Sequence, residues 1–542
     1  MAIFRKSGKR LLFGLVLLVM VLLATRYIPT RTVTHKITIQ EQAPTTRDTY
    51  EVKAPAYVLN TTAEQKIAKA MNLIRLLEAS QSQTLQAAIS TYRLKTGRNP
   101  PKHYDKWFAY AREKQCLIDN YDTLHKDLEP FFKLPPQEFR DRIKMLVEAG
   151  AAPDGEHSYH FIRINQGVVT GPSGRDSPVP GWMGAWLSLI EKSRSGLLLS
   201  AGSTRPESFI ASNAAIISNG VALHAADIDD LALVFNPYDE PRVVYNHKQA
   251  NAVQEALYSP LERVDWHRPS AEEHYEWLLE RCPYRESPFS KLLNKYHGFT
   301  INPDTRVYTE SLVPIISNTK LRHCFADIVV PSNYYITSSL DTQSEVDTIP
   351  WSEKIPMMFW RGSTTGGSPV NLGYAFYHRH RLVKLATNDS HMDIAFTDLV
   401  QCGYFCEHMR LNYPLAPSVP FSNNFKYKYL IDIDGNTFSQ RYMPFLQSNS
   451  LVFKMTIFQE YFDGWLEPFV HYIPINVDLS DLSEKLQWAI DHDEEAEQIA
   501  LNSKYFSKRF LTLDQMDCYM YLMFLELARL YSGEELVLPA AH

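Results

Sequence analysis

The chain has 542 residues, of which 45% are hydrophobic and 21% are charged, and its formal net charge at pH 7 is -6. This length allows two domains and a connecting stalk, and the composition excludes a chain that is disordered throughout. Because basic and acidic residues are interspersed, the chain has no overall field that would gather nucleic acid or an anionic membrane surface. We therefore expect no nucleic-acid partner.

An apolar run near the N-terminus predicts that the chain enters a membrane. Residues 11–24 are apolar, and the basic side chains that flank them are Arg5, Lys6, Lys9, Arg10 and Arg26. A cleaved signal peptide shares this pattern, but a small-residue cleavage site is indistinct, so we expect an uncleaved anchor. The run is shorter than the ~20 residues of a typical spanning helix, a length that the thin membranes of the early secretory pathway accommodate.

The positive N-terminal flank leaves the first residues in the cytosol and sends the rest of the chain into the lumen. The expected segments are a cytosolic tail at 1–10, a transmembrane signal-anchor at 11–25 and a Thr-rich, polar stalk at 26–60. We thus expect a single-pass type II protein of the Golgi or endoplasmic reticulum membrane.

Two glycosylation acceptors fit a lumenal location. Asn60 and Asn388 each begin an Asn-x-Ser/Thr tripeptide, which accepts N-linked glycans in secreted proteins. The six cysteines form no C-x-x-C pair, so neither a zinc ribbon nor a redox motif is indicated. Disulfides are allowed in the lumen, and the sequence leaves their pairing open.

Beyond the stalk, the patterns predict three regions: a helical N-terminal region at 61–150 and two α/β domains at 151–350 and 351–535. The first helix begins near Thr62, and Gln65 completes a capping box with it. Buried strands are predicted at 231–235, 312–316, 328–330, 357–360, 429–433, 451–454 and 470–473. Helices are predicted near the end at 482–490 and 514–530, and a capping box between Thr512 and Gln515 is expected to open the second. Strands that alternate with helices indicate a mostly parallel sheet covered on both faces.

A glycine-rich segment follows the strand predicted at 357–360. Open α/β sheets bind ligands at the carboxyl ends of their strands. Glycines let backbone N–H groups approach phosphate oxygens there, and Arg361 can give a planar, bidentate contact. A surface turn with an ordinary arginine explains the same residues, and the G-K-[ST] of a Walker loop is absent.

A second segment repeats this arrangement after the strand at 429–433, with a glycine turn and a helix expected to open near Ser439. A helix N-terminus with Arg441 beside it is suited to an anion. Asp432 and Asp434 resemble a carboxylate pair for a divalent metal. One strand end supplies too few oxygen ligands, and a glycine turn explains Asp434, so we expect no metal.

Two other polar groups stand out. The basic block at 378–381 is expected to lie on a solvated helix face. Asp239 follows the strand at 231–235, where a carboxylate can be catalytic; a plain Asp-Pro turn accounts for it as well, and on these residues alone the turn is favoured.

Taken together, these blocks resemble glycosyltransferase family 90, the group of fungal capsule-associated proteins and animal protein O-glucosyltransferases. The signature portions are F-W-R-G-S at 359–363, K-Y-K-Y-L at 426–430, S-x-R at 439–441, S-L-V-F at 450–453 and P-F-V-H-Y-I-P at 468–474. The blocks similar to the fungal branch are T-T-G-G at 364–367, H-R-H-R-L-V at 378–383, D-I-D-G at 432–435 and the stretch 97–111. The resemblance extends from about residue 97 to residue 531.

The resemblance implies a GT-B-like fold, in which two Rossmann-like domains face a cleft, with the acceptor on the side of 151–350 and the nucleotide sugar on the side of 351–535. It implies an inverting transfer from a UDP-sugar to a hydroxyl of a glycan or glycoprotein, with no cofactor. The fungal branch favours xylose and the animal branch glucose. The rival expectation is a catalytically silent, lectin-like or scaffolding membrane protein on the same fold.

By resemblance, Asp239 of the D-x-P motif is the catalytic base, and Arg361 and Arg441 contact the donor phosphates. The remaining donor-loop positions are Gly362, Ser363, Asn436, Ser439 and Gln440. Glu460 matches a family glutamate, for which a ribose contact and a structural role at a helix N-terminus are the alternatives. Ser332 aligns near the donor-sugar pocket, with a surface turn as its alternative.

Overall fold

The computed structural model describes residues 62–149, 159–165, 168–170, 231–236, 238–245, 257–269, 273–281, 298, 307–322, 324–332, 334–335, 346–413 and 415–536. All of them belong to one compact unit, Leu59–His542. The predicted tail, signal-anchor and stalk lie outside these ranges, as does Asn60. Within the described ranges, no helix is long and apolar enough to span a bilayer.

The N-terminal part of the unit is helical. Its helices are α2 (Ala63–Ser80), α3 (Leu85–Thr96), α4 (Tyr104–Glu113), α5 (Asp122–Leu128), the 3-10 helix η1 (Glu129–Lys133) and α6 (Pro136–Ala149). The predicted capping box of α2 is confirmed, because the N–H of Gln65 donates to the Thr62 hydroxyl over 3.3 Å and the N–H of Thr62 donates to the Gln65 side chain over 2.8 Å.

A first sheet follows in the order β2-β1-β3-β6-β8. Its strands are β1 (His160–Asn165), β2 (Val168–Thr170), β3 (Leu231–Phe235), β6 (Ile316–Ser317) and β8 (Ile328–Val329). β1 runs antiparallel to both of its neighbours, whereas β3, β6 and β8 are parallel, so this sheet is mixed rather than mostly parallel. Two strands, β4 (Trp266–His267) and β5 (Tyr308–Thr309), pair separately, and α11 spans His274–Arg281.

The prediction for residues 231–235 is confirmed, and the one for 312–316 is largely wrong. The run 312–315 is buried, as an apolar run should be, but only Ile316 enters a strand. Pro314 explains the difference, because it lacks the N–H that a strand ladder needs.

The second sheet is fully parallel, in the order β10-β9-β11-β12-β14. Its strands are β9 (Ile355–Ser363), β10 (Met392–Asp398), β11 (Tyr427–Ile433), β12 (Leu451–Met455) and β14 (Ile473–Pro474). Phe359 and Trp360, which are adjacent on β9, belong to different apolar clusters. Successive side chains of a strand point to opposite faces, so this sheet is buried on both faces, as predicted.

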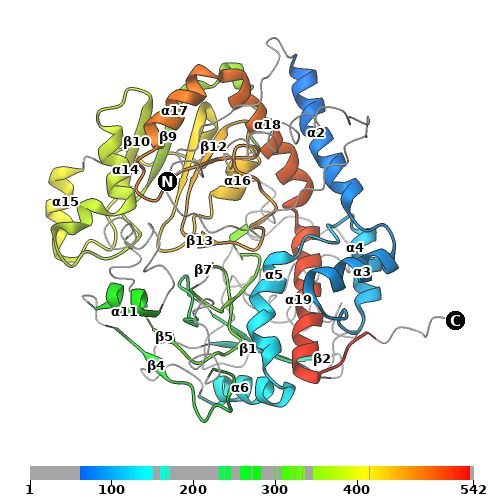
Figure 1. Cartoon of the computed structure of the whole chain (residues 1–542). Helices are drawn as coiled ribbons and strands as arrows, with labels where there is room; N and C mark the ends of the chain where they lie inside the picture. Colours follow the sequence, from blue (N-terminus) through cyan, green and yellow to red (C-terminus); the bar gives the residue numbers. More distant parts are fainter. Residues whose placement is uncertain are drawn as a thin grey trace, which may run out of the picture. The chain divides into compact units, whose positions relative to one another are not determined.

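Helices accompany this second sheet on its sides (Figure 1). α14 (His378–Ala386) packs beside β10, and α16 (Tyr442–Leu446) and α18 (Asp493–Phe510) pack beside β12. α15 (Cys406–Asn412) and α17 (Leu482–Asp491) complete the set, with short 3-10 helices η4 (Trp351–Glu353), η5 (Leu372–Phe376), η6 (Gly403–Phe405) and η7 (Phe421–Lys426). The strand predicted at 470–473 begins only at Ile473, because 467–472 form a tight turn in which Phe469 has a φ of 62°.

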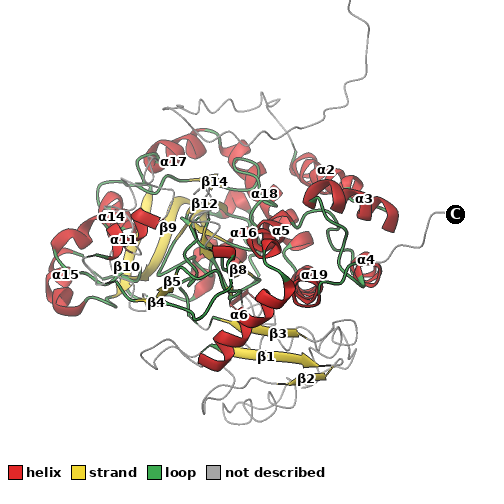
Figure 2. Ribbon diagram, turned by 60° about the horizontal axis from the view of Figure 1, so that its bottom comes forward, coloured by secondary structure: helices red, strands yellow, loops and turns green. Residues whose placement is uncertain are grey.

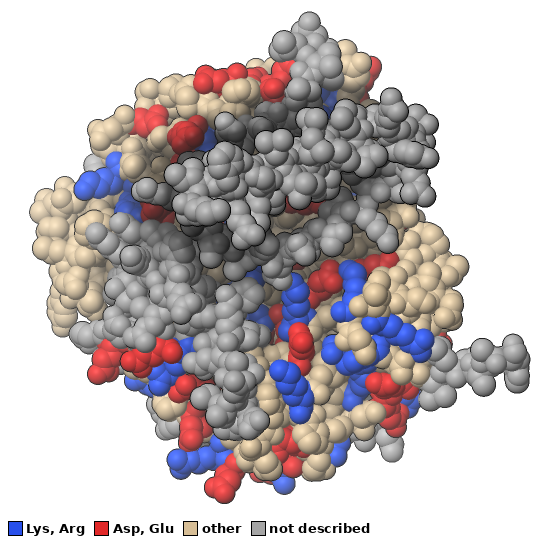
Figure 3. Space-filling view, in the orientation of Figure 1, with Lys and Arg blue, Asp and Glu red and all other residues tan. Residues whose placement is uncertain are grey.

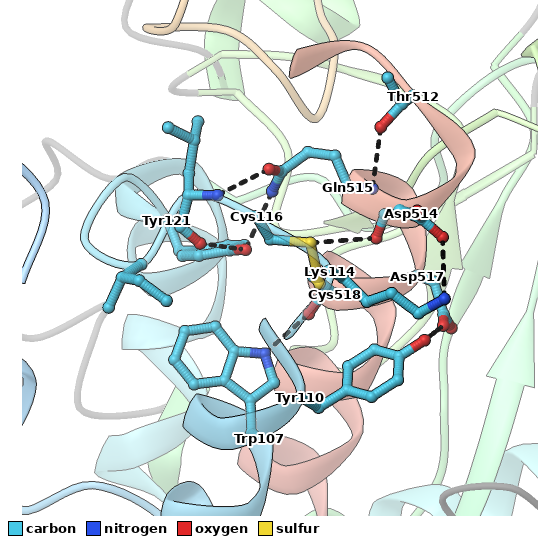
Figure 4. The surroundings of a disulfide bond; sticks show 12 residues. Trp107, Tyr110, Lys114, Cys116, Tyr121, Thr512, Asp514, Gln515, Asp517 and Cys518 are labelled. Atoms are coloured by element: carbon cyan, nitrogen blue, oxygen red, sulfur yellow. Dashed lines mark hydrogen bonds and ion pairs between the residues drawn. A yellow bond between two sulfur atoms is a disulfide. The ribbon is translucent and has the colours of Figure 1, made fainter. Parts of the chain in front are cut away.

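The last helix, α19 (Leu513–Ser532), returns to the N-terminal half. It packs with α6 against β3 (Figure 2). The Tyr519 hydroxyl donates to the carbonyl of Val329 over 2.9 Å, and a disulfide joins Cys518 to Cys116 near α4 (Figure 4). A helix was predicted here at 514–530, and its N-cap, Thr512, accepts from the N–H of Gln515. The predicted capping box is only half formed, because the Gln515 side chain bonds to Leu117 and Tyr121 instead.

A small strand pair joins the two sheets. β7 (Lys320–Leu321) lies in the sequence between β6 and β8 of the first sheet. It pairs antiparallel with β13 (Phe458–Gln459), which follows β12 of the second sheet in the sequence. The Thr319 hydroxyl adds a hydrogen bond of 2.6 Å to the carbonyl of Gln459. These contacts fix the described parts of the two α/β halves against each other.

Candidate active site

Asp239 lies in a turn that is held rigidly at the carboxyl end of β3. The side chain of Asn236 is buried at the centre of this turn. Its amide donates to the carbonyl of Glu240 over 2.7 Å, and its oxygen accepts from the N–H of Tyr238 and from the guanidinium of Arg242, both over 3.2 Å. The backbone that carries Asp239 is therefore fixed from within.

Two polar groups from other segments influence the Asp239 carboxyl. Burial, and after it the charge of Glu240, raise the pKa of Asp239 to about 6, and the Tyr334 hydroxyl and the Asn436 side chain oppose that rise. At neutral pH the group is mostly ionised but close to its titration range, as a general base should be.

Ser332 shapes the turn that presents Tyr334. Its hydroxyl accepts from the N–H of Tyr334 over 3.2 Å, and its carbonyl accepts from the N–H of Tyr335 over 3.1 Å. Ser332 thus lies in the turn that carries Tyr334. Tyr334 was missed by sequence reasoning, although it follows β8 as Asp239 follows β3, and carboxyl ends of neighbouring parallel strands meet at one edge of a sheet.

Asn436 connects this edge to the second sheet. Its side chain accepts from the N–H of Gly366 over 3.1 Å, and it also lowers the pKa of Asp239. Gly366 belongs to the glycine-rich loop after β9, and Asn436 to the loop after β11. The Asn436 side chain therefore joins the two predicted donor loops and influences the predicted base.

Arg441 lies between these two loops. Its guanidinium donates to the carbonyl of Arg361 over 2.8 Å and to the Ser439 hydroxyl over 3.2 Å. Burial lowers its pKa, and the charge of Asp432 opposes that change. The prediction that a helix opens near Ser439 is wrong. The helix α16 begins at Tyr442 and has five residues, so Ser439 does not lie at a helix N-terminus that could bind an anion.

The prediction that the basic block at 378–381 lies on a solvated helix face is also wrong. His378, Arg379 and His380 are 0%, 7% and 1% exposed. The Arg379 guanidinium donates to the carbonyl of Asp434 over 2.7 Å and to that of Ser363 over 3.0 Å. The block begins α14 beside the carboxyl ends of β9 and β11, where loop carbonyls need donors, and this tertiary setting is invisible in the charge pattern.

Arg379 and Arg441 form a pair of neighbouring cations. Both guanidinium groups lie over the ring of Trp360, at 5.4 and 5.3 Å from its centroid. Burial, and then the charge of Arg441, lower the pKa of Arg379 to about 9. Two cations that are packed this closely favour an anion beside them.

The side chain of Arg361 lies on the other face of β9. It stands over the ring of Phe359 at 4.6 Å and forms an ion pair of 2.5 Å with Asp393. Asp393 also accepts from the Tyr427 hydroxyl over 2.8 Å. The structure therefore brings Arg441 together with Arg379 rather than with the side chain of Arg361, whose backbone carbonyl alone contacts Arg441.

The remaining predicted donor positions differ in their surroundings. A side chain at Gly362 would meet the ring of Trp360 at 2.6 Å, so glycine is required there. Ser363 contributes its carbonyl to Arg379, whereas the side chain of Gln440 is exposed. The predicted glycan acceptor Asn388 is exposed in the turn after α14.

Behind the loops lies a buried charge cluster. Lys454 lies 2.6 Å from a carboxylate oxygen of Asp432 and 3.4 Å from one of Glu460, and the Tyr335 hydroxyl donates to the other oxygen of Glu460. Burial raises the pKa of Glu460 to about 8 although Lys454 opposes this, and the two carboxylates raise the pKa of Lys454 above its ordinary value. Glu460, 3% exposed, thus has protein partners on both oxygens.

The carboxylates at the end of β11 are held in different ways. Asp432 pairs with Lys454, whereas Asp434 accepts from the N–H of Ile457 over 2.9 Å. Among the described residues, no group of three or more His, Cys, Asp or Glu side chains is placed to hold a metal ion.

Part of the chain is similar to known proteins. Danio rerio protein O-glucosyltransferase 2 is 39% identical over 217 residues, which are 38% of this chain and 41% of that protein. Homo sapiens protein O-glucosyltransferase 3 is 31% identical over 229 residues, which are 39% of this chain and 41% of that protein. Homo sapiens protein O-glucosyltransferase 1 is 32% identical over 172 residues, which are 31% of this chain and 41% of that protein.

The chain therefore spans about two fifths, 41%, of the length of these relatives. Residues 334–537 match the family model described as glycosyl transferase family 90. This range contains Tyr334, both glycine-rich loops, Arg379 and Arg441. Over this range the chain is similar to glycosyltransferase family 90.

Proposed function

We propose that the protein is an inverting glycosyltransferase that moves a sugar from a UDP-sugar to a hydroxyl of a glycan or glycoprotein. The observation that carries this proposal is the Asn436 side chain, which accepts from the N–H of Gly366 over 3.1 Å and also lowers the pKa of Asp239. It supports a site that combines a proton acceptor with two loops rich in cations and backbone donors. The two α/β sheets, tied together by β7 and β13, support a GT-B-like arrangement for this chemistry.

In the proposed reaction, the acceptor oxygen attacks the anomeric carbon of the donor from the face opposite the diphosphate. The bond between that carbon and the phosphate oxygen breaks, UDP leaves, and Asp239 takes the proton of the acceptor hydroxyl. The transition state has oxocarbenium character, and negative charge develops on the diphosphate. In this proposal Arg441 and Arg379 stabilise that charge. The Arg361 side chain, which pairs with Asp393 on the other face of β9, is proposed to add a planar contact.

The guanidinium groups carry the positive charge that this leaving group needs, so we propose that UDP binds without a divalent cation. Calorimetric titration of UDP in excess chelator tests this point. Binding that depends on added Mn²⁺ would return Asp432 and Asp434 to consideration as metal ligands.

Two donor sugars remain in the proposal, because the fungal resemblance favours xylose whereas the relatives are named as glucosyltransferases. The decisive experiment incubates the soluble lumenal portion with a panel of radiolabelled nucleotide sugars and follows donor hydrolysis and transfer. Turnover of UDP-xylose or UDP-glucose supports an enzyme. UDP binding without turnover of any donor supports the silent, lectin-like alternative.

We further propose that the protein works in the lumen of the Golgi or endoplasmic reticulum, held to the membrane by residues 11–25. The disulfides Cys116–Cys518 and Cys402–Cys406 support an oxidising compartment. Protease protection of the chain in sealed microsomes, with and without detergent, tests the topology.

A further inference from the structure

The side chain of His378 is buried against the two predicted donor loops. His378 is the first residue of α14 and is 0% exposed. Its Nε2 atom lies 2.9 Å from the carbonyl oxygen of Asp434, the first residue after β11. Its Nδ1 atom lies 3.4 Å from the backbone nitrogen of Gly298. Three segments that are far apart in the sequence therefore meet at this ring.

The two partners determine which nitrogen of the ring carries hydrogen. A carbonyl oxygen only accepts hydrogen bonds, so Nε2 is protonated and donates to Asp434. A backbone N–H only donates, so Nδ1 is unprotonated and accepts from Gly298. The imidazole is therefore neutral, has a single tautomer, and uses both of its nitrogens. Such a ring contributes fixed hydrogen bonds and no charge.

The same ring supports the glycine-rich loop after β9. A Cβ atom at Gly366 would lie 2.7 Å from His378 Nε2 and 3.0 Å from the carbonyl oxygen of Gly435, in the loop after β11. The φ of Gly366 is 112°, a conformation that also favours glycine. The backbone of the loop after β9 therefore packs directly on the edge of the imidazole, which limits how closely the two loops approach each other.

Arg379, the next residue of α14, shares one of these partners. Its guanidinium donates to the Asp434 carbonyl over 2.7 Å, beside the 2.9 Å hydrogen bond from His378. A carbonyl oxygen has two lone pairs, and both of them are used here. The histidine therefore helps to hold the loop after β11 without adding to the positive charge of the site.

We propose that His378 is a positioning residue of the donor site, which fixes the spacing between the loops after β9 and β11 and so the contacts of both loops with the diphosphate. This inference rests on the proposed function and adds a residue to it. Hydrogen bonds to phosphate oxygens weaken when their donors are displaced or misaligned, so two loops that share one diphosphate must be held at a fixed distance. The buried ring, bonded at both nitrogens, is such a spacer.

The test compares His378→Gln with His378→Met, because the two side chains have the same length and only glutamine can donate to Asp434. UDP is titrated calorimetrically into each variant, and uridine affinity is measured by competition against UDP. We expect His378→Gln to bind UDP within about threefold of wild type and His378→Met to bind it roughly tenfold more weakly, since a hydrogen bond to a buried carbonyl is lost. Uridine, which has no diphosphate, is expected to bind both variants with the wild-type affinity.

His380→Met is the matched control on the same helix. His380 is 1% exposed, and its ring packs against those of Tyr374, Phe396 and Tyr413. This variant is expected to lower the free energy of unfolding, measured in urea, and to keep the wild-type UDP affinity. Should His378→Met not fold, His378→Asn takes its place, because its side chain is one bond shorter and its amide does not reach Asp434.

The outcomes separate the role of His378 from the proposed function. Wild-type UDP affinity in His378→Met, or the same loss in His378→Gln or in His380→Met, overturns the inference. An equal loss of uridine and UDP affinity overturns it as well, because the defect would then not concern the diphosphate. If the wild-type protein binds no UDP in the same titration, the proposed function fails; if it binds UDP beside an unchanged His378→Met, only the role of His378 fails.

Discussion

The side chain of Asn436 accepts a hydrogen bond of 3.1 Å from the N–H of Gly366, and so ties the loop after β11 to the loop after β9. The same side chain lowers the pKa of Asp239, although Asp239 follows a strand of the other sheet. A turn residue that merely precedes Pro241 has no need of such a neighbour. This relationship supports the proposed catalytic role of Asp239 over the plain turn.

Asp239→Asn is expected to lower transfer by roughly 100-fold to 10,000-fold, because the amide cannot accept the proton. UDP affinity and folding are expected to persist, since the shape hardly changes. Glu240→Gln is the matched control: Glu240 is buried and follows Asp239 directly, so it points elsewhere. An active Asp239→Asn protein beside an inactive Glu240→Gln protein would transfer the role to Glu240.

Asp239 also predicts a pH effect on stability. Folding raises its pKa from 3.8 to about 6, so the stability linked to its protonated form is present below pH 4 and is lost as pH rises through about 6. Asp239→Asn has no such loss, and at pH 7 it is expected to gain on the order of 1 to 3 kcal/mol relative to wild type. Urea unfolding of both proteins at pH 4 and pH 7 measures this gain. The same difference in free energy of unfolding between Asp239→Asn and wild type at both pH values contradicts the prediction.

Activity has its own pH dependence. If Asp239 is the base, kcat/KM falls about tenfold for each pH unit below its pKa of about 6. Above that value the rate is expected to reach a plateau before other groups titrate. A profile that stays flat from pH 5 to pH 7 is incompatible with a base that titrates at this position.

Arg379 supplies a test of the corrected basic block. Arg379→Lys keeps a charge but loses the fork that holds the carbonyls of Ser363 and Asp434, so UDP binding is expected to weaken by tenfold or more. Arg381→Lys is the control on the same helix, because Arg381 donates to the carbonyl of Val477 instead. Equal UDP affinities in the two variants would remove Arg379 from the site.

Arg361→Lys tests the family arginine. A compact ammonium cannot reproduce a bidentate contact with phosphate, so donor binding and turnover are expected to fall together. The ion pair with Asp393 offers a second explanation, namely loss of loop structure. Asp393→Asn discriminates: if it reproduces the whole defect of Arg361→Lys, the ion pair rather than phosphate contact is responsible.

Local signals predicted much of the fold. The alternation of buried strands with helices indicated the parallel second sheet, and the capping residues Thr62 and Thr512 marked two helix starts correctly. The failures have physical causes: Pro314 cannot join a ladder, and the turn at 467–472 delays β14. The mixed first sheet could not be predicted, since strand direction depends on pairing between distant segments.

For the site, the rule that ligands gather at strand ends singled out Asp239, Arg361 and Arg441. It could not supply their neighbours. Arg379 is buried because a helix begins beside the loops after β9 and β11, and Tyr334 influences Asp239 from the turn after β8. The charge pattern describes a segment alone, whereas these contacts come from three-dimensional assembly.

On the face shown in Figure 3, the described Lys and Arg side chains are interspersed with Asp and Glu. A view of the surface does not show the buried arginines.

The disulfide between Cys116 and Cys518 yields the last prediction, because it joins residues 402 positions apart. Trp107 donates its indole N–H to the carbonyl of Cys518 over 2.9 Å, and Gln515 accepts from the N–H of Leu117 over 2.8 Å, so the bond lies in a well-packed junction (Figure 4).

In the chain-entropy account, a cross-link stabilises by restricting the unfolded chain, and the effect grows with the loop that it closes. Replacing both Cys116 and Cys518 by serine is therefore expected to cost up to about 5 kcal/mol. Cys402 and Cys406 close a loop with a separation of only 4, and their double serine variant is expected to cost roughly 2 kcal/mol or less. Complete guanidinium unfolding curves of the two double variants measure the difference in their free energies of unfolding. Equal losses would mean that local packing, rather than the tie between the N-terminal helices and α19, sets the contribution of these bonds.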